Sequence, residues 1–181
     1  ADTAVVCLTT DNEQEAELLA HDLDRLNRER QLIVESIVEE ALGQAQRLSE
    51  QGLLERVLVL HGEGWNVGVV GIVASKILER YYRPTLILSI DQETGLAKGS
   101  ARSIPGFDIH AALTECDDLL DHYGGHQAAA GMTLHRDRLI EFHRRLNDYA
   151  DRVLHEEDLI PIYKPDAELE LADIQPAFIR Q

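Results

Sequence analysis

The chain has 181 residues, of which 44% are hydrophobic and 28% are charged, and its formal net charge is −16. This length suits one compact domain with extensions, or two small domains, with a real hydrophobic core. The apolar runs are too short to span a membrane, and the first residues show no basic leader or apolar signal segment. Two distant cysteines, Cys7 and Cys116, predict free thiols, so we expect a cytoplasmic protein.

The acidic charge is unevenly distributed along the chain. Residues 1–60 hold 13 acidic and 5 basic side chains, whereas residues 61–150 hold 12 and 9. Strong net acidity argues against the broad basic face of a general nucleic-acid binder. The nearly neutral middle segment contains the Gly-rich motifs, so it can still hold a local cationic pocket that binds anions at one focused site.

Apolar residues spaced mostly three and four apart predict one long amphipathic helix over residues 13–51. Thr10 and Glu13 fit a capping box at its start, and Gly52 is a suitable stop. The preceding stretch, Val5–Leu8, fits either a strand or the end of a helix. Because the helix is longer than most globular helices, it either bridges two bodies or forms a coiled-coil-like hairpin with another helix.

Strands that alternate with helices predict an α/β body after this helix. The expected strands cover residues 56–62, 84–91, 93–103 (a turn and a hairpin arm) and 128–135. The expected helices cover residues 68–82, 109–123 and 138–154, the last of them capped by Asp137. A Gly-Gly-His sequence at 124–126 is expected to begin a tight turn. After Leu154, two prolines indicate a linker that leads into an alternating strand.

The strongest local motif is YGGHQAAAG, at residues 123–131. Gly124 and Gly125 let a ligand approach the main chain closely, and exposed amides there can cradle an anion. His126 can donate to a phosphate oxygen. The alternative is a glycine turn at the end of a helix, followed by a packing surface of small residues.

A second motif, KGSARSIPG, covers residues 98–106. If this segment is a strand, Lys98, Ser100 and Arg102 share one face, which makes a coherent anion-binding row. The alternative is a solvent-facing strand that carries ordinary surface charges.

A third motif, HGEGWNVGVVGIVASK, places glycines at the start of a helix, where anions are favoured, but it matches no nucleotide-cofactor loop. Trp65 either stacks on a base or plugs the edge of the core. His122 and His126 are four residues apart, but the glycines between them argue against a helical metal pair. We predict no metal ligands and no catalytic nucleophile in this chain.

These motifs, in this order, resemble the DHHA1 domain of the DHH phosphoesterase superfamily, and specifically its RecJ-type exonucleases. The resemblance rests on WNVGVVGIVASKILERYYRP, KGSARSIPGFDIHAAL and YGGHQAAAG, and on the helical segment DRLNRERQLIVESIVEEA. It implies a DHHA1-like sheet flanked by helices and preceded by a long connecting helix. It divides the chain into residues 1–52 (the end of a preceding domain and the connecting helix), 53–155 (the DHHA1-like domain) and 156–181 (a linker and the start of a following domain).

The resemblance also implies a function: binding of single-stranded DNA in a 5′-to-3′ exonuclease of DNA repair and recombination. Substrate phosphate would be held by Ser100, Arg102, Gly124, Gly125 and His126. The family's Mn²⁺ or Mg²⁺ ligands belong to a DHH domain of the same protein, and no Asp-His-His string occurs here. We therefore expect this chain alone to be inactive. Two alternatives stay open, a hydrolase of short oligoribonucleotides or cyclic dinucleotides and a non-catalytic interaction module.

Overall fold

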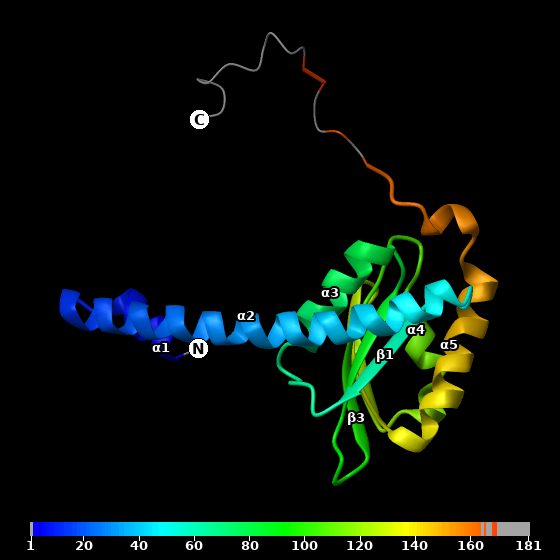
Figure 1. Cartoon of the computed structure of the whole chain (residues 1–181), viewed down its shortest axis with the longest axis horizontal. Helices are drawn as coiled ribbons and strands as arrows, with labels where there is room; N and C mark the ends of the chain where they lie inside the picture. Colours follow the sequence, from blue (N-terminus) through cyan, green and yellow to red (C-terminus); the bar gives the residue numbers. More distant parts are fainter. Residues whose placement is uncertain (1, 164, 166–167, 170–181) are drawn as a thin grey trace.

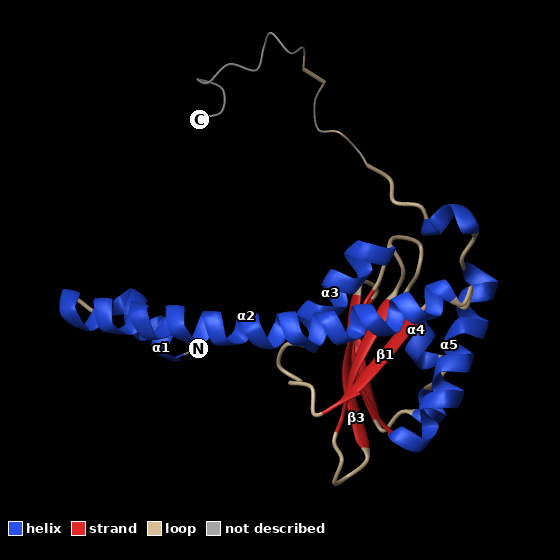
Figure 2. Cartoon of the chain, viewed as in Figure 1, coloured by secondary structure: helices blue, strands red, loops and turns tan. Residues whose placement is uncertain are grey.

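The computed structural model describes residues 2–163, 165, 168 and 169, and consists of a mixed five-stranded sheet with helices on both faces (Figures 1 and 2). The helices are α1 (Asp2–Thr9), α2 (Glu13–Glu50), α3 (Val70–Tyr81), α4 (Ile109–Thr114) and α5 (Leu139–Val153). The strands are β1 (Leu58–Glu63), β2 (Thr85–Ile90), β3 (Leu96–Arg102), β4 (His122–His126) and β5 (Ala129–His135). The predicted architecture, a sheet with flanking helices after a long helix, is confirmed.

The strands lie in the order β1-β2-β3-β5-β4. β1 and β2 are parallel and are connected by α3, whereas all other neighbours are antiparallel. The β2–β3 hairpin turns because the Asp91 carboxylate accepts hydrogen bonds from the amides of Glu93 and Thr94, and because Gly95 takes a φ of 70°. Side chains along each strand alternate between the two faces of the sheet, and different helices cover each face.

The core has two layers, one on each face of the sheet. In Figure 1 the sheet is seen nearly edge-on, with α3 on one side and α4 and α5 on the other. The larger layer, around Phe107 and Phe142, joins α4 and α5 to β1, β2, β3 and β5, and Tyr123 of β4 packs against it. The smaller layer, around Ile87 and Ile77, joins α2 and α3 mainly to β1 and β2. As a consequence, the smaller layer leaves the β5–β4 end of its face without a helical cover.

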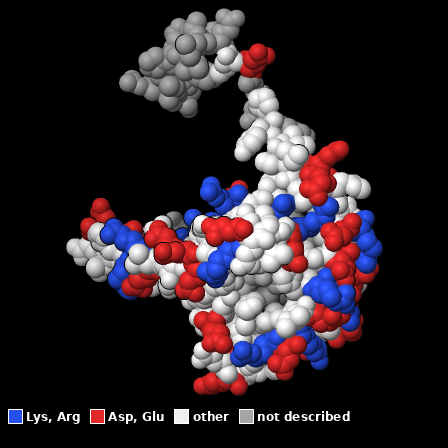
Figure 3. All heavy atoms as spheres, turned by 45° about the vertical axis from the view of Figure 1, so that its right-hand side comes forward, with Lys and Arg blue, Asp and Glu red and all other residues white. Residues whose placement is uncertain are grey.

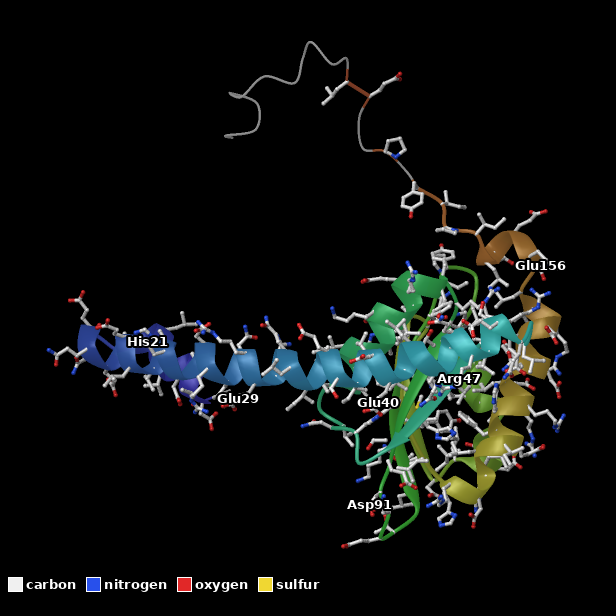
Figure 4. All side chains as sticks on the ribbon, viewed as in Figure 1. His21, Glu29, Glu40, Arg47, Asp91 and Glu156 are labelled. Atoms are coloured by element: carbon white, nitrogen blue, oxygen red, sulfur yellow. The ribbon has the colours of Figure 1, made fainter. Side chains whose placement is uncertain are left out.

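The long predicted helix is present as α2, with 38 residues, but only its second half packs on the sheet. Its buried residues are Val34, Ile37, Ala41 and Ala45. The first half projects beyond the sheet, where His21 and Glu29 lie in the open and α1 folds back along it (Figures 1 and 4). The stretch 5–8 therefore belongs to helix α1. The hairpin of two helices that the sequence allowed is formed by α1 and α2, and it is limited to this projecting part.

The predicted capping residues at two helix starts are wrong. Asn12, not Thr10, caps α2, and its side chain accepts from the amides of Gln14 and Glu15. Asparagine is among the strongest N-cap residues, so it displaces the threonine two positions earlier. Asp137 lies in a short 3₁₀ turn before α5, which has no side-chain cap.

Two further segments differ from the sequence prediction. The helix expected over residues 109–123 ends at Thr114 and continues as a 3₁₀ turn, which brings Leu119 into the core. The Gly-Gly-His sequence does not begin a turn but forms most of strand β4, and the chain reverses after it at 127–128. The strand expected after Leu154 falls almost wholly outside the described residues. Among the described helices, none has the length and apolar character needed to cross a membrane.

The free edge of β1 is covered by two side-chain amides. The Asn147 carboxamide accepts from the Val57 amide at 2.9 Å and donates to the Val57 carbonyl at 3.1 Å. Four residues along, the Gln44 carboxamide donates to the His61 carbonyl at 2.8 Å and accepts from its amide at 3.4 Å. Each amide thus imitates a residue of a neighbouring strand, which blocks the addition of another strand at this edge.

We expect Asn147→Ala to lower the free energy of unfolding by about 2–4 kcal/mol, because it leaves both polar groups of the fully buried Val57 without a partner. Urea denaturation measures this change. Gln44→Ala is the matched control at the exposed end of the edge, where water can replace the amide, and should cost roughly 1 kcal/mol or less. Equal effects of the two substitutions would contradict this explanation of the buried cap.

Candidate nucleic-acid interface

Three rows of residues cross β3, β5 and β4 on the sheet face that α2 and α3 leave uncovered. Paired residues of antiparallel strands point to the same side of the sheet, so each row is a line of neighbouring side chains. The arginine row is Arg102, Ala129 and His126, the serine row is Ser100, Gly131 and Gly124, and the lysine row is Lys98, Thr133 and His122. We call these nine residues the platform.

The platform contains no acidic residue, although the chain has 33 of them. Neither Lys98 nor Arg102 takes part in any ion pair of the described residues. Many other arginines are paired, Arg144 and Arg145 among them. On the α5 side, where acidic and basic side chains intermix (Figure 3), the guanidinium groups of Arg144 and Arg145 lower the pKa of Glu141 to about 2. The cations of the platform are therefore left free for an external anion.

Arg102 is held at the platform by one end of its guanidinium group. Its Nη1 donates to the Ser100 hydroxyl at 2.9 Å and to the Ala101 carbonyl at 2.8 Å. Nε and Nη2 have no partner among the described residues, so the remaining donors can meet a ligand oxygen. Ser100 therefore orients Arg102 in addition to offering its own hydroxyl.

The first turn of α3 lies directly beside this arginine. A Cβ atom on Gly71 would lie 2.9 Å from Arg102 Nη2 and 3.1 Å from Ser100 Oγ. A helix leaves its first amides without intrahelical partners, and no side chain caps α3. Gly71 thus lets the positive end of the helix approach the Arg102 side chain, which adds to the attraction for an anion.

The structure brings four of the five predicted site residues together on the platform: Ser100, Arg102, Gly124 and His126. Gly125 points to the opposite face, where its partner Ala130 is buried in the larger core. A Cβ on Gly125 would lie 2.4 Å from the Ala129 carbonyl oxygen, whereas one on Gly124 would meet nothing within 4 Å. The two glycines therefore have different roles, one in strand packing and one in an open surface.

Sequence reasoning missed His122, Thr133, Gly131 and Gly71 as neighbours of this site. Once HYGGH and AAAGMTLH are both taken as strands, every second residue of each faces the same side of the sheet, and this pattern could have identified the three strand residues. Trp65 is buried, and its indole N–H donates to Glu40 at 2.9 Å, so it plugs the core edge.

The described residues do not provide a metal site. No three His, Cys, Asp or Glu side chains of the described part of the chain are grouped closely enough to hold a metal ion. His122 and His126 share a strand face, but four residues of a strand separate them by about 13 Å, too far for one ion. The implied Mn²⁺ or Mg²⁺ therefore has no ligand set among the residues that the structure describes.

Comparison with known proteins places this fold and these motifs in one family. The DHHA1 domain model matches residues 54–152. The chain is 48% identical to the single-stranded-DNA-specific exonuclease RecJ of Bacillus subtilis over 96% of its length, and 37% identical to that of Escherichia coli over 80%. It spans only 22% and 26% of those two proteins.

A solved structure agrees with the sequence relatives. The crystal structure of Thermus thermophilus RecJ in complex with Mg²⁺ superposes with a TM-score of 0.72 and 35% identity, over 84% of this chain and 23% of that one. The chain thus belongs to the DHHA1 domain family, in the form in which that domain occurs in RecJ exonucleases.

Proposed function

We propose that the chain is the nucleic-acid-binding half of a single-stranded-DNA-specific 5′-to-3′ exonuclease, and that the platform binds the DNA backbone. The observation that carries the proposal is the acid-free platform, where Nε and Nη2 of Arg102 have no partner among the described residues, in a chain of net charge −16. The names of the relatives supply the substrate class, single-stranded DNA. In this proposal residues 1–52 connect to a DHH domain, 53–155 form the binding domain, and 156–181 lead into a following domain.

The platform is suited to position a phosphate rather than to cleave it. Nε and Nη2 of Arg102 are free to donate to the oxygens of a phosphate group, and His126 lies in the same row on the other side of Ala129. Gly124 and Gly131 carry no side chain, so a sugar–phosphate backbone can lie close to the sheet. In the whole protein, Mn²⁺ or Mg²⁺ on the DHH domain would activate water and stabilise charge at the scissile phosphate. The platform would hold the strand in line for that step.

The projecting part of α1 and α2 supports a second element of the proposal, the contact with the DHH domain. Several large apolar side chains are exposed there: Val5 at 59%, Leu8 at 86%, Leu18 at 71% and Leu32 at 66%. Exposed apolar residues that follow one projecting element indicate an interaction surface. We propose that the DHH domain of the same protein covers it.

The proposed function predicts weak and salt-sensitive binding of single-stranded DNA by this chain. Few phosphates are contacted and the net charge opposes approach. For a single strand, the slope of log K against log salt is about −0.7 for each contacted phosphate, so a slope between roughly −1 and −3 is expected. Titration of a labelled oligothymidylate at several salt concentrations measures it. Tight binding without salt dependence would contradict phosphate contacts at the platform.

The same titration separates the proposal from one alternative, and the substrate preference of the whole protein separates it from the other. Arg102→Ala should weaken binding, whereas Arg80→Ala, an exposed arginine on α3 away from the platform, should not. A non-catalytic interaction module predicts no effect of either substitution. A hydrolase of short oligoribonucleotides or cyclic dinucleotides predicts that the whole protein prefers those compounds to long single-stranded DNA.

A further inference from the structure

We propose that the lysine row, Lys98, Thr133 and His122, is a second phosphate-binding row, two backbone repeats away from the arginine row. A single strand would then lie along β3 and be held at both ends of the platform. This inference rests on the proposed function, because it names a second contact of the same interface. Its tests are chosen so that the two proposals can fail separately.

The spacing of the rows fits an extended sugar–phosphate backbone. Adjacent rows are two residues apart on each strand, roughly 6.7 Å, so the arginine and lysine rows are about 13 Å apart. The distance between successive phosphates of an extended nucleic-acid backbone is similar to the length of two residues in a β-strand. Three consecutive phosphates can therefore lie over the three rows, with the small residues of the serine row under the middle one.

The lysine row has the chemistry that a phosphate requires. Lys98 is exposed and forms no ion pair of the described residues, and the hydroxyl of Thr133 and imidazole of His122 have no hydrogen-bond partner among them. Hydrogen bonds from Thr94 lower the pKa of Asp91, and Lys98 adds a smaller effect from beyond ion-pair distance. The Oδ1 of that carboxylate already accepts from the amide and the hydroxyl of Thr94. An ammonium, a hydroxyl and an imidazole N–H thus lie in one row across three neighbouring strands as donors.

A cavity beside Lys98 gives the nucleotide at this row space for its sugar or base. Its volume is about 330 Å³, and Trp65, Val67, Ser89 and Leu96 are among the residues that line it. The Val67 side chain is 50% exposed and offers apolar surface at the rim. The strand can therefore enter the lysine row without displacing protein.

The test compares two oligothymidylates without terminal phosphates, a dinucleotide with one phosphate and a tetranucleotide with three. Affinities for the 181-residue chain are measured by NMR titration at low salt. The unaltered chain should bind the tetranucleotide more tightly, because only this ligand reaches both outer rows. Lys98→Ala should reduce the tetranucleotide-to-dinucleotide affinity ratio by roughly three- to tenfold, the scale of one partly exposed charged contact. Affinity for the dinucleotide should change by less than about twofold.

Lys76→Ala is the matched control, because Lys76 is an exposed lysine on α3 outside the platform, and it should leave both affinities unchanged. An unchanged ratio in Lys98→Ala, with Arg102→Ala still weakening both ligands, would overturn the second row alone. If Arg102→Ala were also without effect, the platform itself would be disproved as the DNA site. Thermal melts establish that each variant is folded.

Discussion

Arg102→Ala in the whole protein should lower the turnover of single-stranded DNA by roughly 30- to 1,000-fold while the fold stays intact. The loss corresponds to about 2–4 kcal/mol for one charge-assisted contact at a site where charge develops. The fold should survive because Nη1 bonds only to Ser100 and to the Ala101 carbonyl at the surface of the sheet. Steady-state rates, measured beside thermal melts, separate lost turnover from lost stability.

Two further variants test the role of this site in turnover. Arg102→Lys should recover little activity, because one ammonium group cannot bond to Ser100 and also present two donors to a phosphate. His126→Ala should lower turnover in the same direction, whereas His155→Ala, an exposed histidine before the 3₁₀ turn at Glu156–Leu159 and outside both proposed surfaces, should have no effect on catalysis. Near-normal turnover in Arg102→Ala would remove this residue from the site.

Gly125→Ala should destabilise the fold strongly, and Gly124→Ala should not. A Cβ on Gly125 would lie 2.4 Å from the Ala129 carbonyl oxygen and 2.5 Å from the Ala130 Cα, and its φ of 153° is one that other residues rarely adopt. Both clashing atoms are backbone atoms of β5, so relief requires the two strands to separate. We expect a loss of about 3 kcal/mol or more, or failure to fold.

Gly124 is the matched control, one residue away on the same strand. Its added Cβ would meet no protein atom within 4 Å, so the melting temperature should stay close to that of the unaltered chain. The new methyl group would lie on the platform between the arginine and lysine rows, so DNA binding should weaken. If the two glycines gave the same loss of stability, Gly125 would have no special role in strand packing.

Periodicity is enough to predict the long helix, α3, α5 and four of the five strands, because burial on one face leaves a readable pattern. It cannot predict β4. A Gly-Gly pair has low strand propensity and is typical of turns, and the close fit of Gly125 against β5 is not visible in the sequence. The end of α4 is equally hidden, since no Gly or Pro breaks the helical pattern after Thr114.

The candidate site is predictable in part for the same reason. The alternation of KGSAR alone places Ser100 and Arg102 on one face of a strand. His122 and Thr133 join them only through the pairing of β4 with β5, which is a long-range feature of the sheet. The hydrogen bonds by which the Asn147 and Gln44 carboxamides cover the edge of β1 are likewise not predictable, because in the sequence these residues look like ordinary surface amides.

The 38 uninterrupted residues of α2 make it a strut about 57 Å long. Its second half is fixed to the sheet through Ala41 and Ala45, so the far end cannot move independently of the platform without breaking helical hydrogen bonds. Anything that binds the first half is therefore held at a set distance and a set rotation from Arg102. One residue inserted between Glu29 and Val34 would turn that body by about 100° and shift it by about 1.5 Å. The number of residues in this single helix thus sets the distance and the rotation between the projecting part and the platform, two surfaces that lie apart from each other.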